Sequence, residues 1–201
     1  FNEKRSIIGL IKQHYNENLV QIKYNAPAIT NNEIKKEISN EAHKAALCFG
    51  NGAFHTEIIY SKEKGAVLVE TSPRVSYATV ALTRIIDNFD PVTAIINDAS
   101  NLNLDYSYNK IKAKFAVLEH IIPEKSSVYN GADISKFEIN NVYEISPVVE
   151  KGHIVNEFKT NVDRVMYFVA YANSESELDE KATSIKKQLI KECFKNNENE
   201  K

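Results

Sequence analysis

The sequence has few of the residues that mark several common protein classes. Its 201 residues include two cysteines, six glycines, one methionine and no tryptophan. Two cysteines cannot build the disulfide framework of a small secreted domain, so we expect reduced thiols. No apolar run approaches the length of a transmembrane helix, and no signal peptide is visible at the start. These features predict a cytoplasmic protein without a membrane partner.

An excess of charge of one sign is also missing. Lys and Arg number 25 and Asp and Glu number 27, so the net charge is −2 at pH 7. This balance gives no electrostatic reason to bind nucleic acid or an anionic membrane. Neither of the glycine-rich phosphate-binding patterns, GxxxxGK[ST] and GxGxxG, occurs. What remains is a chain with 43% hydrophobic residues, enough for one large domain or two small ones.

The most informative stretch runs from Ala53 to Arg74. Two runs rich in β-branched and aromatic residues, 53–61 and 66–72, flank the polar segment Lys62–Gly65. This pattern predicts a β-hairpin with a four-residue loop. If that loop closes directly, the facing pairs are Glu57 with Glu70, Ile59 with Leu68, and Ser61 with Ala66. Two carboxylates facing each other across a strand pair repel.

The two-residue period of a strand places further polar groups beside the two acids. His55 shares a face with Glu57, Ser72 shares the matching face with Glu70, and Arg74 follows just past the strand end. A divalent cation would turn the repulsion into attraction, because Mg²⁺ takes one or two carboxylates together with substrate phosphates. The alternative is an exposed hairpin in a shifted register whose acids are solvated. The pattern alone leaves both interpretations open.

This stretch resembles the metal-binding hairpin of the ATP-grasp superfamily of ligases. In that family a strand carrying Glu is followed by a strand that ends in Glu-x-Asn-x-Arg, and the corresponding segments here are His55–Glu57 and Glu70–Arg74. The resemblance covers the chain loosely from about Ile7 to Ile190. Its sequence motif is most similar to that of the L-amino-acid ligase, or carboxylate–amine ligase, branch. It implies that Glu57 and Glu70 bind the Mg²⁺ ions, or Mn²⁺ in their place, that hold the phosphates of ATP.

The resemblance also implies roles for the residues around the two acids. Arg74 would be the catalytic residue that stabilises an acyl phosphate, and Ser72 would be a metal ligand in the place of the family's Asn. His55, Ser76 and Tyr77 would face the substrate, although Ser76 is equally a good helix N-cap. The implied partners are ATP and small carboxylate and amine substrates, and we expect a homodimer.

Family members take their glycine-rich loop and adenine-side Lys from upstream of the hairpin. The chain begins at Phe1 and contains no such loop, so we expect it to be the C-terminal, metal-binding part of a ligase. Hydrophobic periodicity predicts an α+β fold, and the polar stretch 100–108 divides it. Residues 1–104 would form an antiparallel sheet with flanking helices, the C-terminal lobe of an ATP-grasp fold. Residues 105–201 would form a small mixed β/α subdomain, similar to that of biotin carboxylase, that closes with a helix.

Local patterns predict two further features of the first domain. Residues 6–12 and 19–24 are expected to pair as a hairpin around the turn 13–18. Thr30 is expected to begin a helix, because Thr30 and Glu33 have the spacing of a capping box.

Three functions remain open from the sequence. The first is an ATP-dependent carboxylate–amine ligase, of the amino-acid or dipeptide ligase type, that acts through an acyl phosphate. The second is a noncatalytic ATP-grasp-like binding or structural module, which Ser72 and the missing phosphate loop would suit. The third is a carboxylating enzyme of the biotin-carboxylase or carbamoyl-phosphate-synthase type.

Overall fold

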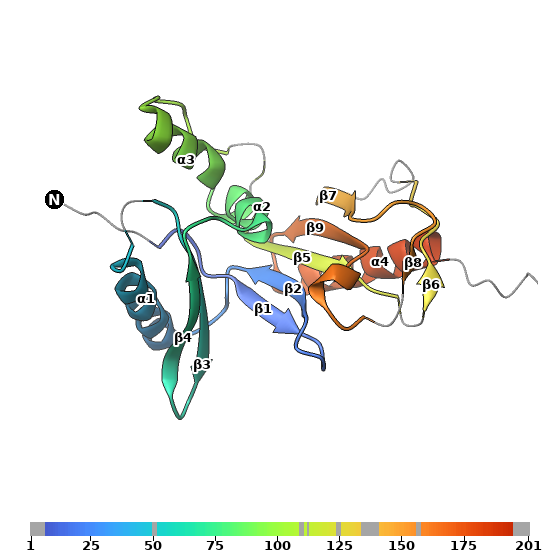
Figure 1. Ribbon diagram of the computed structural model, residues 1–201, viewed down its shortest axis with the longest axis horizontal. Helices are drawn as coiled ribbons and strands as arrows, with labels where there is room; N and C mark the ends of the chain where they lie inside the picture. The colour runs from blue at the N-terminus through green and yellow to red at the C-terminus, as the bar shows by residue number, and fades with distance from the viewer. Residues whose placement is uncertain are drawn as a thin grey trace, which may run out of the picture. The chain divides into compact units, whose positions relative to one another are not determined.

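The computed structural model describes residues 7–49, 52–108, 111, 113–123, 126–133, 141–155 and 158–194. The fold is α+β with antiparallel strand pairs, as the sequence predicts (Figure 1). The chain divides into two compact units: unit 1 comprises residues 1–11 and 26–112, and unit 2 comprises residues 12–25 and 113–201. No helix in the described part is both long and apolar enough to cross a membrane.

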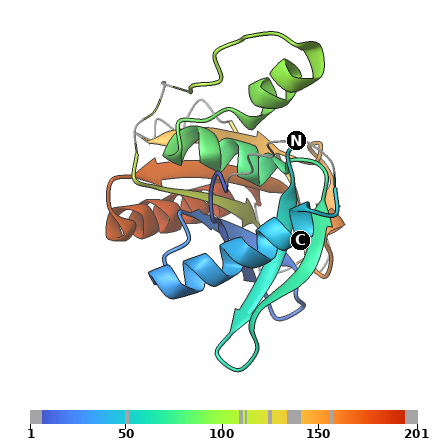
Figure 2. The ribbon, with the colours of Figure 1, turned by 90° about the vertical axis from the view of Figure 1, so that its left-hand side faces the viewer.

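The described part of unit 1 contains three helices and a β-hairpin. In chain order these are α1 (Asn32–Ala46), β3 (His55–Ser61), β4 (Gly65–Ser72), α2 (Tyr77–Ile86) and α3 (Pro91–Ser100). β3 and β4 form a two-stranded sheet of their own, and α1 packs against both strands (Figure 2). The hairpin is therefore a thin element, supported by a helix rather than by a stack of further strands.

Short polar side chains decide where the helices of unit 1 begin. The Asn31 side chain accepts a hydrogen bond from the backbone N–H of Ile34 at 2.9 Å. The predicted capping box at Thr30 is therefore wrong by one residue, because Asn caps a helix at least as well as Thr does. Asp90 caps α3, and Pro91 occupies the first helical position, where its missing N–H costs nothing.

Unit 2 is organised around one five-stranded sheet with the order β1-β2-β5-β9-β7. The sheet's strands are β1 (Lys12–Tyr15), β2 (Gln21–Ala26), β5 (Phe115–Ile121), β7 (Val142–Pro147) and β9 (Met166–Ala172). A smaller pair, β6 (Ser127–Val128) and β8 (Ile154–Val155), stands apart from it. The C-terminal helix α4 (Glu175–Cys193) follows β9 and packs on β5 and β9.

The core of unit 2 lies between this sheet and α4. Phe168 and Met166 from β9 are fully buried, together with Leu189 of α4. Cys193 lies in the same cluster, and its burial raises the pKa of the thiol to about 11. Such a thiol stays protonated and unreactive at neutral pH. Cys48 is exposed, and both thiols are free.

The β1–β2 hairpin departs from its predicted bounds. Strand β1 begins at Lys12, so part of the predicted turn 13–18 is strand. The reason is Asn16, whose side chain accepts hydrogen bonds from two nearby backbone N–H groups and tightens the turn. The hairpin belongs to unit 2, and unit 1 extends to residue 112. The predicted domain border after residue 104 therefore does not coincide with the border between the compact units.

Candidate functional site

The β3–β4 hairpin brings the two predicted metal ligands together. Glu57 and Glu70 are direct cross-strand partners, as the sequence predicts. The pairing near the turn differs from the predicted one. Ser61 pairs with Gly65 and leaves a loop of three residues, 62–64. Gly65 has φ +68°, a left-handed conformation that glycine adopts without strain. The predicted four-residue loop is therefore wrong.

A β-bulge restores the register next to the acids. The pairing shifts between Glu57 and Ile58, so that Val69 is an extra residue on β4 between two paired positions. The loop has one residue fewer than predicted, and strand β4 has one residue more. These two differences cancel at the pair of Glu57 and Glu70. They do not cancel nearer the turn, and the predicted pairs Ile59–Leu68 and Ser61–Ala66 are wrong. The observed partners there are Ile59 with Val67 and Tyr60 with Ala66.

The polar residues beside the acids share their face of the hairpin. Ser72 is the cross-strand partner of His55, and its hydroxyl donates a hydrogen bond to Glu70 at 3.3 Å. Glu57 is half-buried and Glu70 is exposed. The Nδ1 atom of His55 is buried and has no hydrogen-bond partner among the described residues. The face therefore combines two carboxylates, a hydroxyl and an imidazole whose Nδ1 atom is buried.

Arg74 stands where the hairpin passes into helix α2. Its backbone N–H donates to the carbonyl of Ser72 at 2.8 Å, which turns the chain sharply at the end of β4. The guanidinium is exposed, and among the described residues its one hydrogen bond is a 3.5 Å contact to the Val75 carbonyl. The side chain is thus held loosely and keeps most of its donors for another group.

The start of α2 follows Arg74 directly. Ser76 is the N-cap, and its hydroxyl accepts a hydrogen bond from the Thr79 N–H at 3.2 Å. The Ser76 hydroxyl is therefore engaged in capping, which is one of the two roles that the sequence left open. Tyr77, the first residue of the helix, is exposed. The N-terminal end of a helix favours anions, because its backbone N–H groups point outward.

Glu37 of α1 contacts the β3–β4 hairpin, and no local sequence pattern indicates this contact. Its carboxylate accepts a hydrogen bond from the backbone N–H of Ala66 at 2.8 Å, at the start of β4. Helical periodicity alone places Glu37 on a solvated face. The contact joins residues 29 positions apart, so only the packing of α1 on the hairpin could show it.

The donor set of the hairpin suits a hard cation that is shared with another molecule. No group of three or more His, Cys, Asp or Glu side chains that could enclose a metal occurs among the described residues. The two opposed carboxylates and one hydroxyl are all oxygen donors, the type that Mg²⁺ prefers. Because they cannot fill an octahedral shell, waters or phosphate oxygens of a bound molecule would have to complete it.

Comparison with solved structures shows which proteins share this architecture. Phosphoribosylglycinamide synthetase from Anaerococcus prevotii aligns over 87% of this chain with a TM-score of 0.70 and 17% identity. L-amino acid ligase from Bacillus licheniformis aligns over 88% with a TM-score of 0.68 and 15% identity. The biotin carboxylase domain of Hydrogenobacter thermophilus 2-oxoglutarate carboxylase, solved with MgADP, ADP and bicarbonate, aligns over 88% with a TM-score of 0.65 and 15% identity.

These matches cover only part of each solved protein. The chain spans 46%, 44% and 40% of the three structures, respectively. No family model matches the sequence, and no curated protein matches it at a significant level. At these identities the likeness concerns the fold, and the roles of individual residues have to be argued from the chain itself.

Proposed function

We propose that this chain, whose fold is that of the ATP-grasp ligases, is the metal-binding part of an ATP-dependent carboxylate–amine ligase. The observation that carries the proposal is the pairing of Glu57 with Glu70 across the hairpin, with Arg74 just beyond the second acid. Two opposed carboxylates are unfavourable without a cation between them. The fold is shared with nucleotide-dependent ligases, and phosphoryl transfer from a nucleotide requires such a cation.

Glu57 and Glu70 would hold Mg²⁺, or Mn²⁺ in its place, through their carboxylate oxygens. Ser72 is placed to support Glu70, because its hydroxyl already donates to that carboxylate. This contact suggests that Ser72 orients Glu70 rather than replacing the amide ligand of the family. When bound, the metal neutralises the charge of the ATP phosphates, which is the main requirement of phosphoryl transfer.

Arg74 would meet the negative charge that develops on the transferred phosphoryl group. Its guanidinium is exposed and almost free of protein partners in the described part of the chain, and Arg binds phosphate oxygens in a fork geometry. The N-terminal end of α2, two residues further on, would add backbone donors beside it. His55 and Tyr77 lie on either side of these groups in sequence and would contact the substrate.

The reaction would proceed in two balanced steps. An oxygen of the substrate carboxylate attacks the γ-phosphorus of ATP, ADP leaves, and an acyl phosphate forms. An amine then attacks the carbonyl carbon, inorganic phosphate leaves, and the amine loses a proton. The charge on the phosphate oxygens grows in both steps, and fixed cationic donors at that place lower the barrier.

The test is made in the complete protein with the variants Glu70→Gln and Arg74→Ala. Each should reduce ADP release by roughly 100-fold or more, since each removes charge stabilisation at the transferred phosphoryl group. The matched controls are Glu63→Gln and Lys62→Ala, which change the same types of charge in the loop of the same hairpin. The controls should keep near-normal turnover.

A thermal shift separates metal binding from a structural role. Without Mg²⁺, Glu70→Gln should be at least as stable as the unmodified protein, because it removes the repulsion with Glu57. With Mg²⁺ and ATP, the unmodified protein should gain stability and the variant should not. Near-normal turnover in either variant, or an equal shift in both proteins, would refute the assignment.

A carboxylating activity is the second candidate. It is favoured by the likeness to the biotin carboxylase domain that was solved with bicarbonate. An ATPase assay of the complete protein separates the two candidates. ADP release that depends on bicarbonate and not on an amine would replace the ligase proposal, whereas dependence on a carboxylate and an amine would support it.

A further inference from the structure

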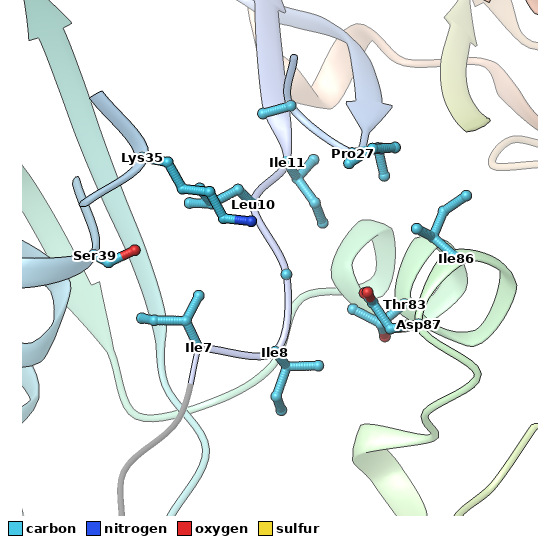
Figure 3. Close-up of a pocket in the computed structure, with 13 residues that line it drawn as sticks. Ile7, Ile8, Leu10, Ile11, Pro27, Lys35, Ser39, Thr83, Ile86 and Asp87 are labelled. Carbon is cyan, nitrogen blue, oxygen red and sulfur yellow. The ribbon is translucent and has the colours of Figure 1, made fainter. Parts of the chain in front are cut away.

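Unit 1 contains a pocket that the proposed chemistry does not use. Its volume is about 160 Å³, and it is formed by residues 7–11, Pro27, the first half of α1 and the C-terminal end of α2 (Figure 3). A cavity of about 150 Å³ is large enough for a benzene-sized molecule. The pocket is thus sized for a small ligand and not for a nucleotide.

Apolar side chains line the pocket from two elements. Ile7, Ile8 and Leu10 from the first segment and Ile86 from α2 supply branched aliphatic side chains (Figure 3). Segment 7–11 is held in place by a hydrogen bond from the Ala28 N–H to the Leu10 carbonyl at 2.7 Å. Apolar walls with a few converging polar groups are the usual composition of small-molecule sites.

Charged groups of opposite sign line the same pocket from different elements. Lys35 and Ser39 come from α1, and Asp87 follows the last residue of α2. None of these three side chains makes a hydrogen bond or an ion pair within the described part of the chain. Desolvation raises the pKa of Asp87, and the charge of Lys35 offsets this only in part. The negative end of the α2 dipole, beside Asp87, does not stabilise a carboxylate, and Lys35 supplies the positive charge that acts on it. Both residues are exposed.

Gly9 keeps the carboxylate of Asp87 at the pocket. A Cβ atom at this position would lie 2.9 Å from Asp87 Oδ2, closer than carbon and oxygen normally approach. The glycine therefore allows the backbone of segment 7–11 to pass directly over the acid. Any side chain there would displace the carboxylate or the segment.

We propose that this pocket binds a small zwitterion with an apolar tail, of the class of the aliphatic α-amino acids. The ligand's ammonium group would pair with Asp87, and its carboxylate with Lys35 and the Ser39 hydroxyl. Its tail would contact the aliphatic side chains of segment 7–11 and of Ile86. The pocket contacts the C-terminal end of α2, whereas Ser76 and the start of that helix follow Arg74. A ten-residue helix is about 15 Å long, so this is a second site and not part of the proposed catalytic hairpin.

The test is calorimetric titration of the complete protein with L-leucine in the absence of ATP and Mg²⁺. Saturable binding is expected, and Asp87→Asn and Lys35→Gln should each weaken it by about tenfold or more. Gly9→Ala should weaken it as well, because it disturbs the acid without removing a charge. The controls Lys36→Gln and Asp98→Asn, exposed residues that do not line the pocket, should bind as the unmodified protein does.

Ligand analogues test whether the pocket recognises both charged groups of the ligand. Isoamylamine lacks the carboxylate, 4-methylpentanoate lacks the ammonium group, and glycine lacks the tail, so each should bind at least about tenfold more weakly than L-leucine. Absence of saturable L-leucine binding would overturn the proposal. So would equal binding of the analogues, or unchanged binding by folded Asp87→Asn and Gly9→Ala. Because ATP is absent, none of these results bears on the ligase proposal.

Discussion

Strands β4 and β9 both contain valine and alanine, and these residues have opposite surroundings in the two strands. In β9, Phe168, Val169 and Ala170 are each 0% exposed, since unit 2 encloses this strand in its sheet and core. In β4, Val69 is 54% exposed, although it is as good a strand former as Val169. A valine thus favours a strand at both positions and does not by itself predict whether that strand carries the core.

The difference separates stability from chemistry in this chain. Unit 2 has the large apolar cluster between sheet and helix, whereas the hairpin of unit 1 has acids, a hydroxyl and an exposed guanidinium. Two carboxylates can face each other only where water or a cation reaches them, because burying unpaired charge is costly. A thin, half-exposed hairpin is therefore a suitable place for Glu57 and Glu70.

The largest expected effect on stability is in β9. Phe168→Ala should lower the free energy of unfolding by about 3–5 kcal/mol, because it leaves a cavity in the core of unit 2. Ile59→Ala, at a position of β3 that is 64% exposed, should change it by no more than about 0.5 kcal/mol. Urea denaturation measures both. Similar losses in the two variants would remove the contrast between the units.

The second largest expected effect is a dependence of stability on pH that is caused by His120 in β5. His120 is 7% exposed, and burial, with the Arg164 charge next, lowers the pKa of its imidazole to about 4. Between pH 6.5 and 4 the unfolded chain binds a proton that the folded chain does not, so stability falls as the pH is lowered. The shift corresponds to a loss on the order of 3 kcal/mol at the acidic end of this range.

Replacing this histidine should flatten that dependence. His120→Gln should lose stability less steeply than the unmodified protein between pH 6.5 and 4, measured by urea denaturation at several pH values. The exposed His153→Gln serves as the control and should keep the slope of the unmodified protein. An unchanged slope in His120→Gln would mean that another group controls the acid transition.

The smallest expected effect is at the contact between α1 and the hairpin. Glu37→Gln weakens the hydrogen bond from the Ala66 N–H, which should cost about 1 kcal/mol or less at this exposed site. Faster hydrogen exchange of the Ala66 amide is the sensitive measurement. Glu63→Gln, in the loop of the same hairpin, should leave that amide unchanged. If Glu37→Gln exchanges at the original rate, helix α1 does not hold the hairpin at this point.

Some features could be predicted because they depend on neighbouring residues. Ser76 caps α2 and Pro91 begins α3, both from patterns within a few positions. The predicted pairing of Glu57 with Glu70 is also observed, but only because the shorter loop and the bulge at Val69 cancel. The α+β class also follows from such patterns and is confirmed. The resemblance to the ATP-grasp ligases is confirmed for the fold alone. The roles of the hairpin residues in binding metal and substrate stay predictions.

Other features could not be predicted because they join distant parts of the chain. The bulge at Val69 corrects a loop that is one residue shorter than predicted, and nothing in the local sequence demands it. The hydrogen bond from Ala66 to Glu37 and the presence of Lys35 and Asp87 at one pocket depend on how helices pack in unit 1.

The amino-acid sequence by itself determined the strand and helix periods and the starts of α2 and α3, because these arise from the stereochemistry of adjacent residues. It placed two acids in a hairpin and left their exact register to the loop and the bulge. Only the tertiary structure decided which strand would be buried, how the register was corrected and which charged groups would line a pocket. Those outcomes depend on packing between segments far apart in the chain, where the burial of surface and the pairing of charges are settled together.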